Sequence, residues 1–287
     1  MNKNVIFFMA LMSLFIVTTL TSCNSVIEND DNLITLMNAK WEISDPNSAY
    51  SSFEFNRDGN FIVVEDGTDV FLKAGLNKES SFLQQYPKKI DIRSSSDSKF
   101  SSVHFGKFQI DGNTINLSGF GTITVTSITA DKFSFSFSLE STGENWNFTT
   151  NKAKEPILAS SRTEMFCRTW IIHNVIIDET TLSEAEKNWY VYQYGSDWKA
   201  EAEKELIGAT VLFTKAGTYF VSYADEELNP GLFWWKWGNK EETVIHYSEN
   251  NWQDNWQEHN FPLIEELSTT TFKMKDNGRY YELTLSK

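Results

Sequence analysis

Two tryptophans near the C-terminus stand among side chains that can hydrogen-bond a ligand. Trp252 and Trp256 lie in residues 250–260, a run rich in Asn, Gln, Asp and Glu that has the composition of a loop. Planar rings beside amides and carboxylates suit stacking on a sugar and hydrogen bonding to its hydroxyls. Because tryptophan is highly buried on average, the same two rings could instead plug and cover the end of a barrel.

The aromatic residues before this run extend the same candidate site. Eight of the ten tryptophans follow residue 165, which concentrates the large rings in the second half of the chain. Successive side chains of a strand point to opposite faces, so Trp235 and Trp237 share a face while Trp234 lies on the other. At least one bulky ring therefore faces water or a cavity mouth. The predicted ligand-binding residues are Trp234, Trp235, Trp237, Tyr247, Trp252 and Trp256.

The sequence lacks motifs for catalysis, cofactors and metals. Its four histidines show neither His-x-x-x-His nor His-Glu-x-x-His spacing, and it contains no P-loop, Gly-x-Gly-x-x-Gly or Gly-x-Ser-x-Gly motif. The segments that begin at Asp58, Asp111 and Asp276 lack the ligand ladder of an EF-hand and predict hairpin turns. We predict a non-catalytic protein without cofactor or metal, and a buried, inert thiol at Cys167.

The composition limits the class of partner. A formal net charge of −14 makes nucleic acid a poor partner, because an acidic surface repels phosphate backbones. The aromatic content of 15% is too high for a disordered acidic chain. Composition therefore indicates a folded, soluble ectodomain.

The two halves of the chain carry the same order of signals. Trp41 precedes a hairpin that turns at Gly59, and Trp170 precedes one that turns at Gly217. Alternating runs around a glycine predict β-hairpins, because glycine takes the positive φ of tight turns. In residues 133–139 phenylalanine alternates with serine, so this strand has one buried face. Each half is predicted to be an antiparallel meander.

A polar segment with a proline, residues 151–164, separates the halves as a predicted linker. The first predicted domain is 33–150 and the second is 165–287. Residues 66–102 add a Ser-rich polar insertion to the first domain, and residues 178–208 add a helical insertion to the second.

Two short helices are expected in the second insertion. Ser183 and Glu186 have the spacing of a capping box, in which each side chain satisfies the other residue's free backbone N–H. Trp198, Ala202 and Leu206 follow at a spacing of four, which places them on one helical stripe. We expect both helices to pack against a barrel.

This order of signals resembles the lipocalin-like family, and the resemblance covers both predicted domains. The family opens with Gly-x-Trp, whose tryptophan closes one end of an eight-stranded barrel. Trp41 and Trp170 match this motif, whereas Ala39 and Arg168 replace its glycine. The resemblance implies an all-β chain of two tandem lipocalin-like antiparallel meander β-barrels, the second with a short helical insertion. It also implies ligand binding inside or at the mouth of a barrel.

The N-terminus predicts a signal peptide and a lipid anchor. Lys3 precedes an apolar run over residues 5–20, which is shorter than the roughly 20 residues of a membrane-spanning helix. The string Leu20-Thr21-Ser22-Cys23 resembles the lipobox of bacterial lipoproteins, which implies cleavage after Ser22 and lipid attachment to Cys23. Loss of residues 1–22 removes only Lys3, so the mature formal charge becomes −15.

Several acyl chains on Cys23 would attach the chain stably to the outer membrane. Residues 23–32 are polar and acidic beyond the cysteine, which suits a solvated tether. Acidic residues at this place also resemble the surface-export signal of Bacteroidetes-type lipoproteins, so a location on the cell surface is one of two open alternatives for the leaflet.

The sequence is compatible with two functions. The first is a binding module for a small apolar or glycan ligand in the second barrel, and the amide-flanked tryptophans favour it. The second is a structural component of a cell-surface assembly, with surface protein partners and no small ligand. The tandem architecture with polar insertions is compatible with this alternative.

Overall fold

The computed structural model describes residues 38–65, 103–224, 230–248, 262–276 and 278–286. The signal peptide, Cys23, the tether and the polar insertion at 66–102 lie outside the described residues. Two of the six predicted ligand-binding residues, Trp252 and Trp256, also lie outside them. In the described part of the chain, no helix combines the length and apolar character needed to cross a bilayer.

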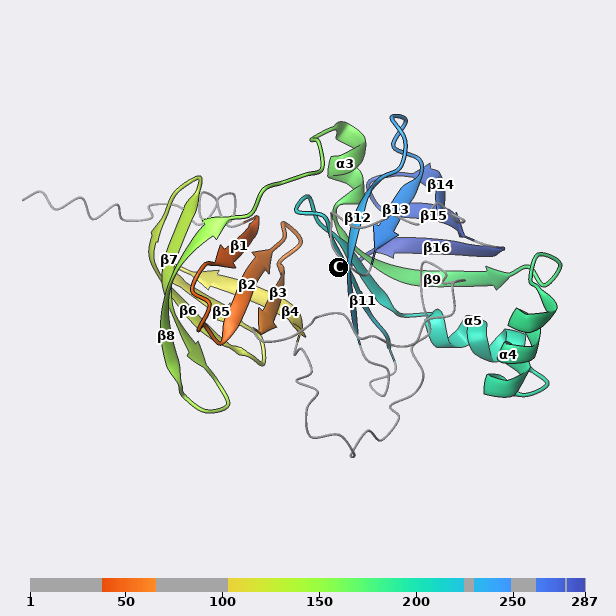
Figure 1. The fold of residues 1–287 in the computed structure, drawn as a ribbon, viewed down its shortest axis with the longest axis horizontal. Helices are drawn as coiled ribbons and strands as arrows, with labels where there is room; N and C mark the ends of the chain where they lie inside the picture. The colour runs from red at the N-terminus through yellow and green to blue at the C-terminus, as the bar shows by residue number, and fades with distance from the viewer. Residues whose placement is uncertain (1–37, 66–102, 225–229, 249–261, 277, 287) are drawn as a thin grey trace, which may run out of the picture.

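The first eight strands form a closed antiparallel barrel in simple meander order, in which the first strand pairs with the last (Figure 1). The strands are β1 (Lys40–Ile43), β2 (Tyr50–Phe55), β3 (Asn60–Glu65), β4 (Val103–Asp111), β5 (Thr114–Leu117), β6 (Gly121–Ile128), β7 (Lys132–Leu139) and β8 (Asn145–Lys152).

Period-two alternation fills this barrel with aromatic rings. Phe133, Phe135 and Phe137 of β7 are all buried, and the serines between them lie on the outer face. Trp41 of β1 is fully buried and meets Phe133 edge to face, with ring centroids 5.4 Å apart. Gly59 turns the β2–β3 hairpin with a φ of 75°, which confirms the turn predicted there.

The second half forms a second antiparallel eight-stranded sheet, with a helix before it and two helices after its first strand. The helices are α3 (Ser161–Phe166), α4 (Glu184–Tyr194) and α5 (Trp198–Leu206). The strands are β9 (Thr169–Ile177), β10 (Thr210–Phe213), β11 (Thr218–Ser222), β12 (Gly231–Trp237), β13 (Ile245–Ser248), β14 (Leu263–Leu267), β15 (Thr271–Asp276) and β16 (Arg279–Leu285).

The strand order β13-β12-β11-β10-β9-β16-β15-β14 curls into a nearly closed barrel. An isolated bridge between Val244 and Leu263 joins its two edge strands. The amide of Ile264 donates to the carbonyl of Thr243 at 2.7 Å on the same seam. The predicted fold, two tandem antiparallel meander barrels with a helical insertion in the second, is confirmed.

The helices cover opposite ends of the second barrel, because β9 begins just after α3 and ends where the chain leaves for α4 (Figure 1). The capping box of Ser183 and Glu186 is present at the start of α4. The α5 residues Trp198, Ala202 and Leu206 are buried against the barrel, as their spacing predicts. Within the predicted linker, residues 151–164, β8 ends at Lys152 and α3 begins at Ser161.

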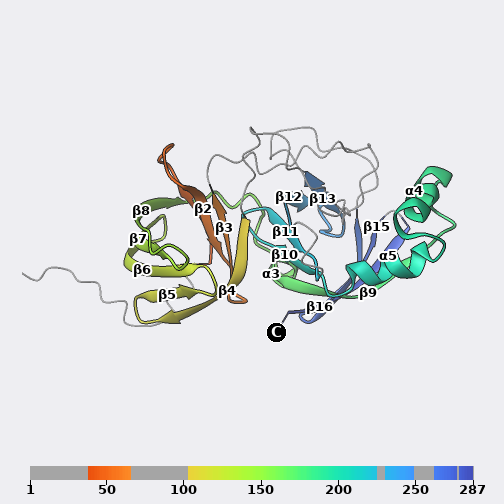
Figure 2. The ribbon, with the colours of Figure 1, turned by 90° about the horizontal axis from the view of Figure 1, so that it is seen from below.

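The two barrels pack through their outer faces, with β3 and β4 of the first against β10, β11 and β12 of the second (Figure 2). The apolar centre of this contact includes the rings of Phe105 and Phe220, whose centroids lie 4.7 Å apart. The buried residues of the contact are Ile62, Val64, Leu212 and Phe220, and Val103, Phe105 and Leu232 pack against them. The interface is therefore a small hydrophobic core of its own.

Side chains at the β2–β3 turn form hydrogen bonds with the second half of the chain at one edge of this interface. The Asp58 carboxylate accepts hydrogen bonds from Arg168 Nε at 3.1 Å, from Arg168 Nη2 at 2.8 Å and from the Thr169 backbone amide at 2.8 Å. The Thr169 hydroxyl in turn accepts from the side-chain amides of Asn56 and Asn60, at 2.9 and 2.7 Å. Arg168 and Thr169 of the second half thus bind the first barrel.

Substitution of Asp58 by alanine tests how much these hydrogen bonds contribute to stability. The change leaves the Arg168 guanidinium and the Thr169 amide without their acceptor, so we expect a loss of about 2–3 kcal/mol in the free energy of unfolding. Urea denaturation of the Asp58→Ala variant measures it. Asp111→Ala is the matched control, because Asp111 is an exposed residue at the β4–β5 turn. Equal stability of the two variants would contradict the role assigned to Asp58.

Candidate functional site

Two of the predicted binding residues pack beneath α3 inside the second barrel. Trp235 is fully buried and its indole Nε1 donates to the Thr214 carbonyl at 2.9 Å. Trp237 is partly buried and its Nε1 donates to the Thr163 hydroxyl of α3, also at 2.9 Å. Phe166 of α3 contacts both rings, with centroids 5.1 and 4.9 Å away. These contacts cover the α3 end of the barrel and use both indole N–H donors.

Trp234 lies on the opposite face of β12, as alternation predicts, and belongs to the contact between the barrels. Lys40 Nζ of β1 lies 4.5 Å from the centroid of its ring. Lys40 pairs across strands with Glu54, and Trp234 pairs with Thr218. The Thr218 hydroxyl donates to Glu54 Oε2 at 2.7 Å. A cation–π contact and a buried hydrogen bond therefore join two cross-strand pairs face to face.

Tyr247 remains from the predicted site within the described residues. It lies on the edge strand β13 opposite Trp235, is partly buried and packs against the barrel core. Its ring centroid is 6.4 Å from that of Tyr219. The structure thus places Trp235, Trp237 and Tyr247 in one barrel and Trp234 outside it, and it does not describe the remaining two tryptophans.

A polar group that the sequence analysis missed lies at the other end of the second barrel, next to α4. The Arg279 guanidinium, 7% exposed, donates from Nε and Nη2 to the Tyr190 hydroxyl of α4, at 3.0 and 2.5 Å. Asp276, the cross-strand partner of Arg279, is also buried, and so is Tyr281, at 1% exposure. An arginine, a carboxylate and two tyrosines therefore share the α4 end of the interior.

Two donors in this group have no hydrogen-bond partner among the described residues: Arg279 Nη1 and the Tyr281 hydroxyl. Burial raises the pKa of Tyr281 well above its ordinary value, so the hydroxyl stays protonated and remains a donor. A buried donor without an acceptor costs on the order of 1–3 kcal/mol. Such groups indicate a place where something else supplies the acceptor.

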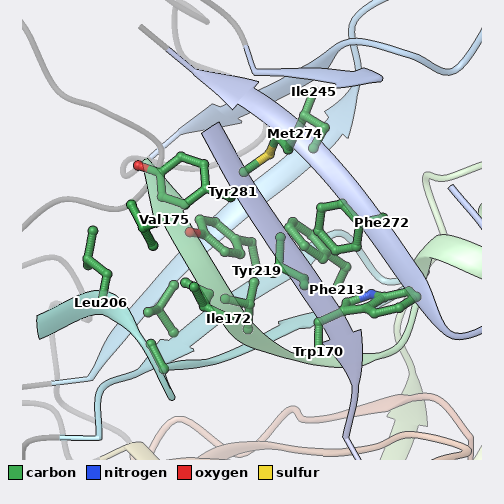
Figure 3. Packing of buried hydrophobic residues seen from close by; sticks show 14 of the residues in the cluster. Trp170, Ile172, Val175, Leu206, Phe213, Tyr219, Ile245, Phe272, Met274 and Tyr281 are labelled. Atoms are coloured by element: carbon green, nitrogen blue, oxygen red, sulfur yellow. The ribbon is translucent and has the colours of Figure 1, made fainter. Parts of the chain in front are cut away.

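The core of the barrel separates these donors from the tryptophans. Figure 3 shows Trp170, Phe213 and Phe272 together on one side, and the hydroxyls of Tyr219 and Tyr281 directed to the side where Leu206 of α5 lies. The interior thus changes along its length from mainly aromatic near α3 to more polar near α4.

Strand alternation was the signal that could have revealed this group. Arg279, Tyr281 and Leu283 are buried at every second position of β16, whereas the residues between them are more exposed. The sequence of the Asp276 segment by itself predicts only a hairpin turn. The turn is present, with Gly278 at a φ of 75°, but Asp276 and Arg279 on its two sides are directed into the barrel.

Two other side chains that could be reactive, His104 and Cys167, have their contacts elsewhere in the structure. Among the described residues, no three His, Cys, Asp or Glu side chains are grouped so that they could hold a metal ion. His104 Nε2 lies 2.8 Å from Glu65 Oε1, and its ring stacks on Phe120 at a centroid distance of 4.1 Å. Cys167 is buried, and desolvation raises the pKa of its thiol.

The Tyr281 hydroxyl gives a direct test of this site in the ligand-free protein. Tyr281→Phe removes a buried donor that has no partner, so we expect the free energy of unfolding to rise by about 1 kcal/mol. Chemical denaturation measures the change. Tyr192→Phe, at a tyrosine of α4 that is 84% exposed, serves as the control and should change little. A destabilised Tyr281→Phe variant would mean that the hydroxyl is already satisfied in the free protein.

A comparison with protein-family models finds none that matches this chain, and a comparison with curated proteins likewise finds no match. A function therefore has to be argued from the chemistry of the site.

Proposed function

We propose that the mature chain is a non-catalytic binding protein, anchored by lipid to the outer membrane, whose second barrel binds a small apolar or glycan ligand. The anchor part of this proposal rests on the Leu20-Thr21-Ser22-Cys23 string and the apolar run before it. The binding part rests on the interior of the second barrel.

The observation that carries the proposal is the pair of unpartnered donors at the α4 end, Arg279 Nη1 and the Tyr281 hydroxyl. Natural proteins seldom bury polar groups without a partner, and a binding site is one reason to keep them. The α3 end supports the same location, because Trp235 and Trp237 already fill it with their N–H groups bonded. The proposed site therefore lies at the α4 end, and Tyr247 is the predicted residue that could contribute to it.

A second candidate function is favoured by the contact between the barrels. Three kinds of contact join the two barrels: the apolar cluster, the Asp58 hydrogen bonds and the cation–π contact between Lys40 and Trp234. A fixed pair of barrels suits a structural or interaction component of a cell-surface assembly, with no small ligand.

A panel of glycans and lipids separates the two functions. A ligand that binds only the folded chain stabilises it by about 2.7 kcal/mol at a concentration 100 times its Kd, so we expect its Tm to rise by several degrees. Thermal unfolding of the mature chain with each compound measures the shift. If no compound shifts the Tm, the small-ligand function fails and the assembly function is favoured.

The lipid anchor has its own test. Cys23→Ser removes the acceptor thiol, so the variant should lose acyl labelling and should not be processed to the mature mass. Radiolabelled palmitate incorporation and mass spectrometry of membrane fractions measure both effects. Cys167→Ser is the control, because Cys167 is buried in the second barrel and should leave labelling unchanged. Labelling that survives Cys23→Ser would rule out the anchor.

A further inference from the structure

We propose that the ligand of the second barrel is uncharged and carries a carbonyl oxygen that accepts hydrogen bonds from Arg279 and Tyr281, and that it reaches them under α4. This inference rests on the proposed function, whose ligand it assigns to a chemical class.

The two donors are neighbours on one face of β16. Arg279 and Tyr281 are two residues apart on a strand, so their side chains leave the same face, and both are buried. Nε and Nη2 of the guanidinium are occupied by the Tyr190 hydroxyl, which leaves Nη1 as the donor without a partner. A carbonyl oxygen has two lone pairs and can accept from Nη1 and from the Tyr281 hydroxyl together.

The charges at this end favour a neutral ligand. Arg279 is always cationic, and its cross-strand partner Asp276 places a carboxylate in the same buried region. Tyr190 and Tyr281 are the neutral members of this group, and the Glu203 carboxylate of α5 adds another anion near it, since it accepts from the backbone amide of Ile177 opposite Arg279 at 2.8 Å. A carboxylate ligand would add a second buried anion beside one cation, and an unbalanced buried charge is costly.

The partly buried ring of Tyr247 on the edge strand supplies the apolar part of the site. It contacts Tyr219, whose own ring is fully buried between Phe213 at 4.9 Å and Phe233 at 5.2 Å. Rings of this kind contact the apolar faces of sugars while donors bind their polar substituents. An N-acetylated sugar, which combines a neutral amide carbonyl with a pyranose ring, has the required chemistry.

Helix α4 is the weakest cover of this end. Tyr190 is its one buried residue, and the side chain is held by the Arg279 hydrogen bonds and by stacking on Trp198, with centroids 4.9 Å apart. Val191 and Tyr192 of the same helix are exposed. Elements with few buried contacts open at lower free energy than core strands, so displacement of α4 exposes the donors before the barrel unfolds.

Titration of the mature chain with N-acetylglucosamine tests the proposal, with glucosamine and acetate as comparison probes. We expect N-acetylglucosamine to shift the Arg279 Nε–H resonance in ¹⁵N NMR spectra, and the two charged probes to leave it in place. Loss of one neutral hydrogen bond should weaken Kd by about 3–10-fold in Tyr281→Phe. Tyr192→Phe should bind as the wild type does.

Several outcomes would overturn this assignment. Acetate that shifts the resonance as strongly as N-acetylglucosamine would make the site anionic in preference, and binding that is unchanged in Tyr281→Phe and in Arg279→Lys would place the sugar elsewhere. A crystal structure from the titrated protein that shows only ordered water on Arg279 Nη1 would also reject it. If compounds of the glycan and lipid panel bind but none needs Arg279, the proposed function stands and this inference alone fails.

Discussion

Side chains have to fill the interior of each eight-stranded barrel, and this requirement shapes both halves of the protein. Such a barrel encloses a space just wide enough for side chains to fill. In the first barrel the alternating phenylalanines of β7 meet Trp41 and Phe53 across that space, at centroid distances of 5.1–5.5 Å. The first barrel therefore gains its stability from rings that leave the outer face free for other contacts.

The outer faces are where the two barrels meet. Inner-face residues such as Phe61 and Val63 belong to the barrel core, whereas Ile62 between them packs on the second barrel. The same strand thus contributes to two cores, one on each side. At the edge of the interface, Asp58 satisfies both a guanidinium and a backbone amide, which gives the contact a fixed register as well as apolar area.

The second barrel obeys the same constraint at its α3 end and departs from it at α4. Aromatic rings with bonded N–H groups seal the first end, while Arg279, Asp276 and Tyr281 bring polar atoms into the second. Apolar side chains there would avoid the desolvation of these groups. The polar end is therefore the part of the interior whose composition stability alone does not explain, and it carries the functional proposal.

Local and periodic features of this protein can be predicted from its amino-acid sequence. Alternation placed Phe133, Phe135 and Phe137 inside a strand, Gly59 marked a hairpin, and the Ser183 capping box marked the start of a helix. Each of these depends on neighbours within a few residues, so the pattern carries the information. The two-barrel fold followed from the same signals, repeated in both halves.

Contacts between residues far apart in the chain emerge only from the folded arrangement of the two barrels. The pairing of Asp58 with Arg168 spans 110 positions, and that of Arg279 with Tyr190 spans 89, so no local pattern could specify either. Trp234 and Trp235 are adjacent and of one residue type, yet one faces the other barrel and one fills the core. Side-chain type and strand period fix which residues share a face, but only packing fixes what that face meets.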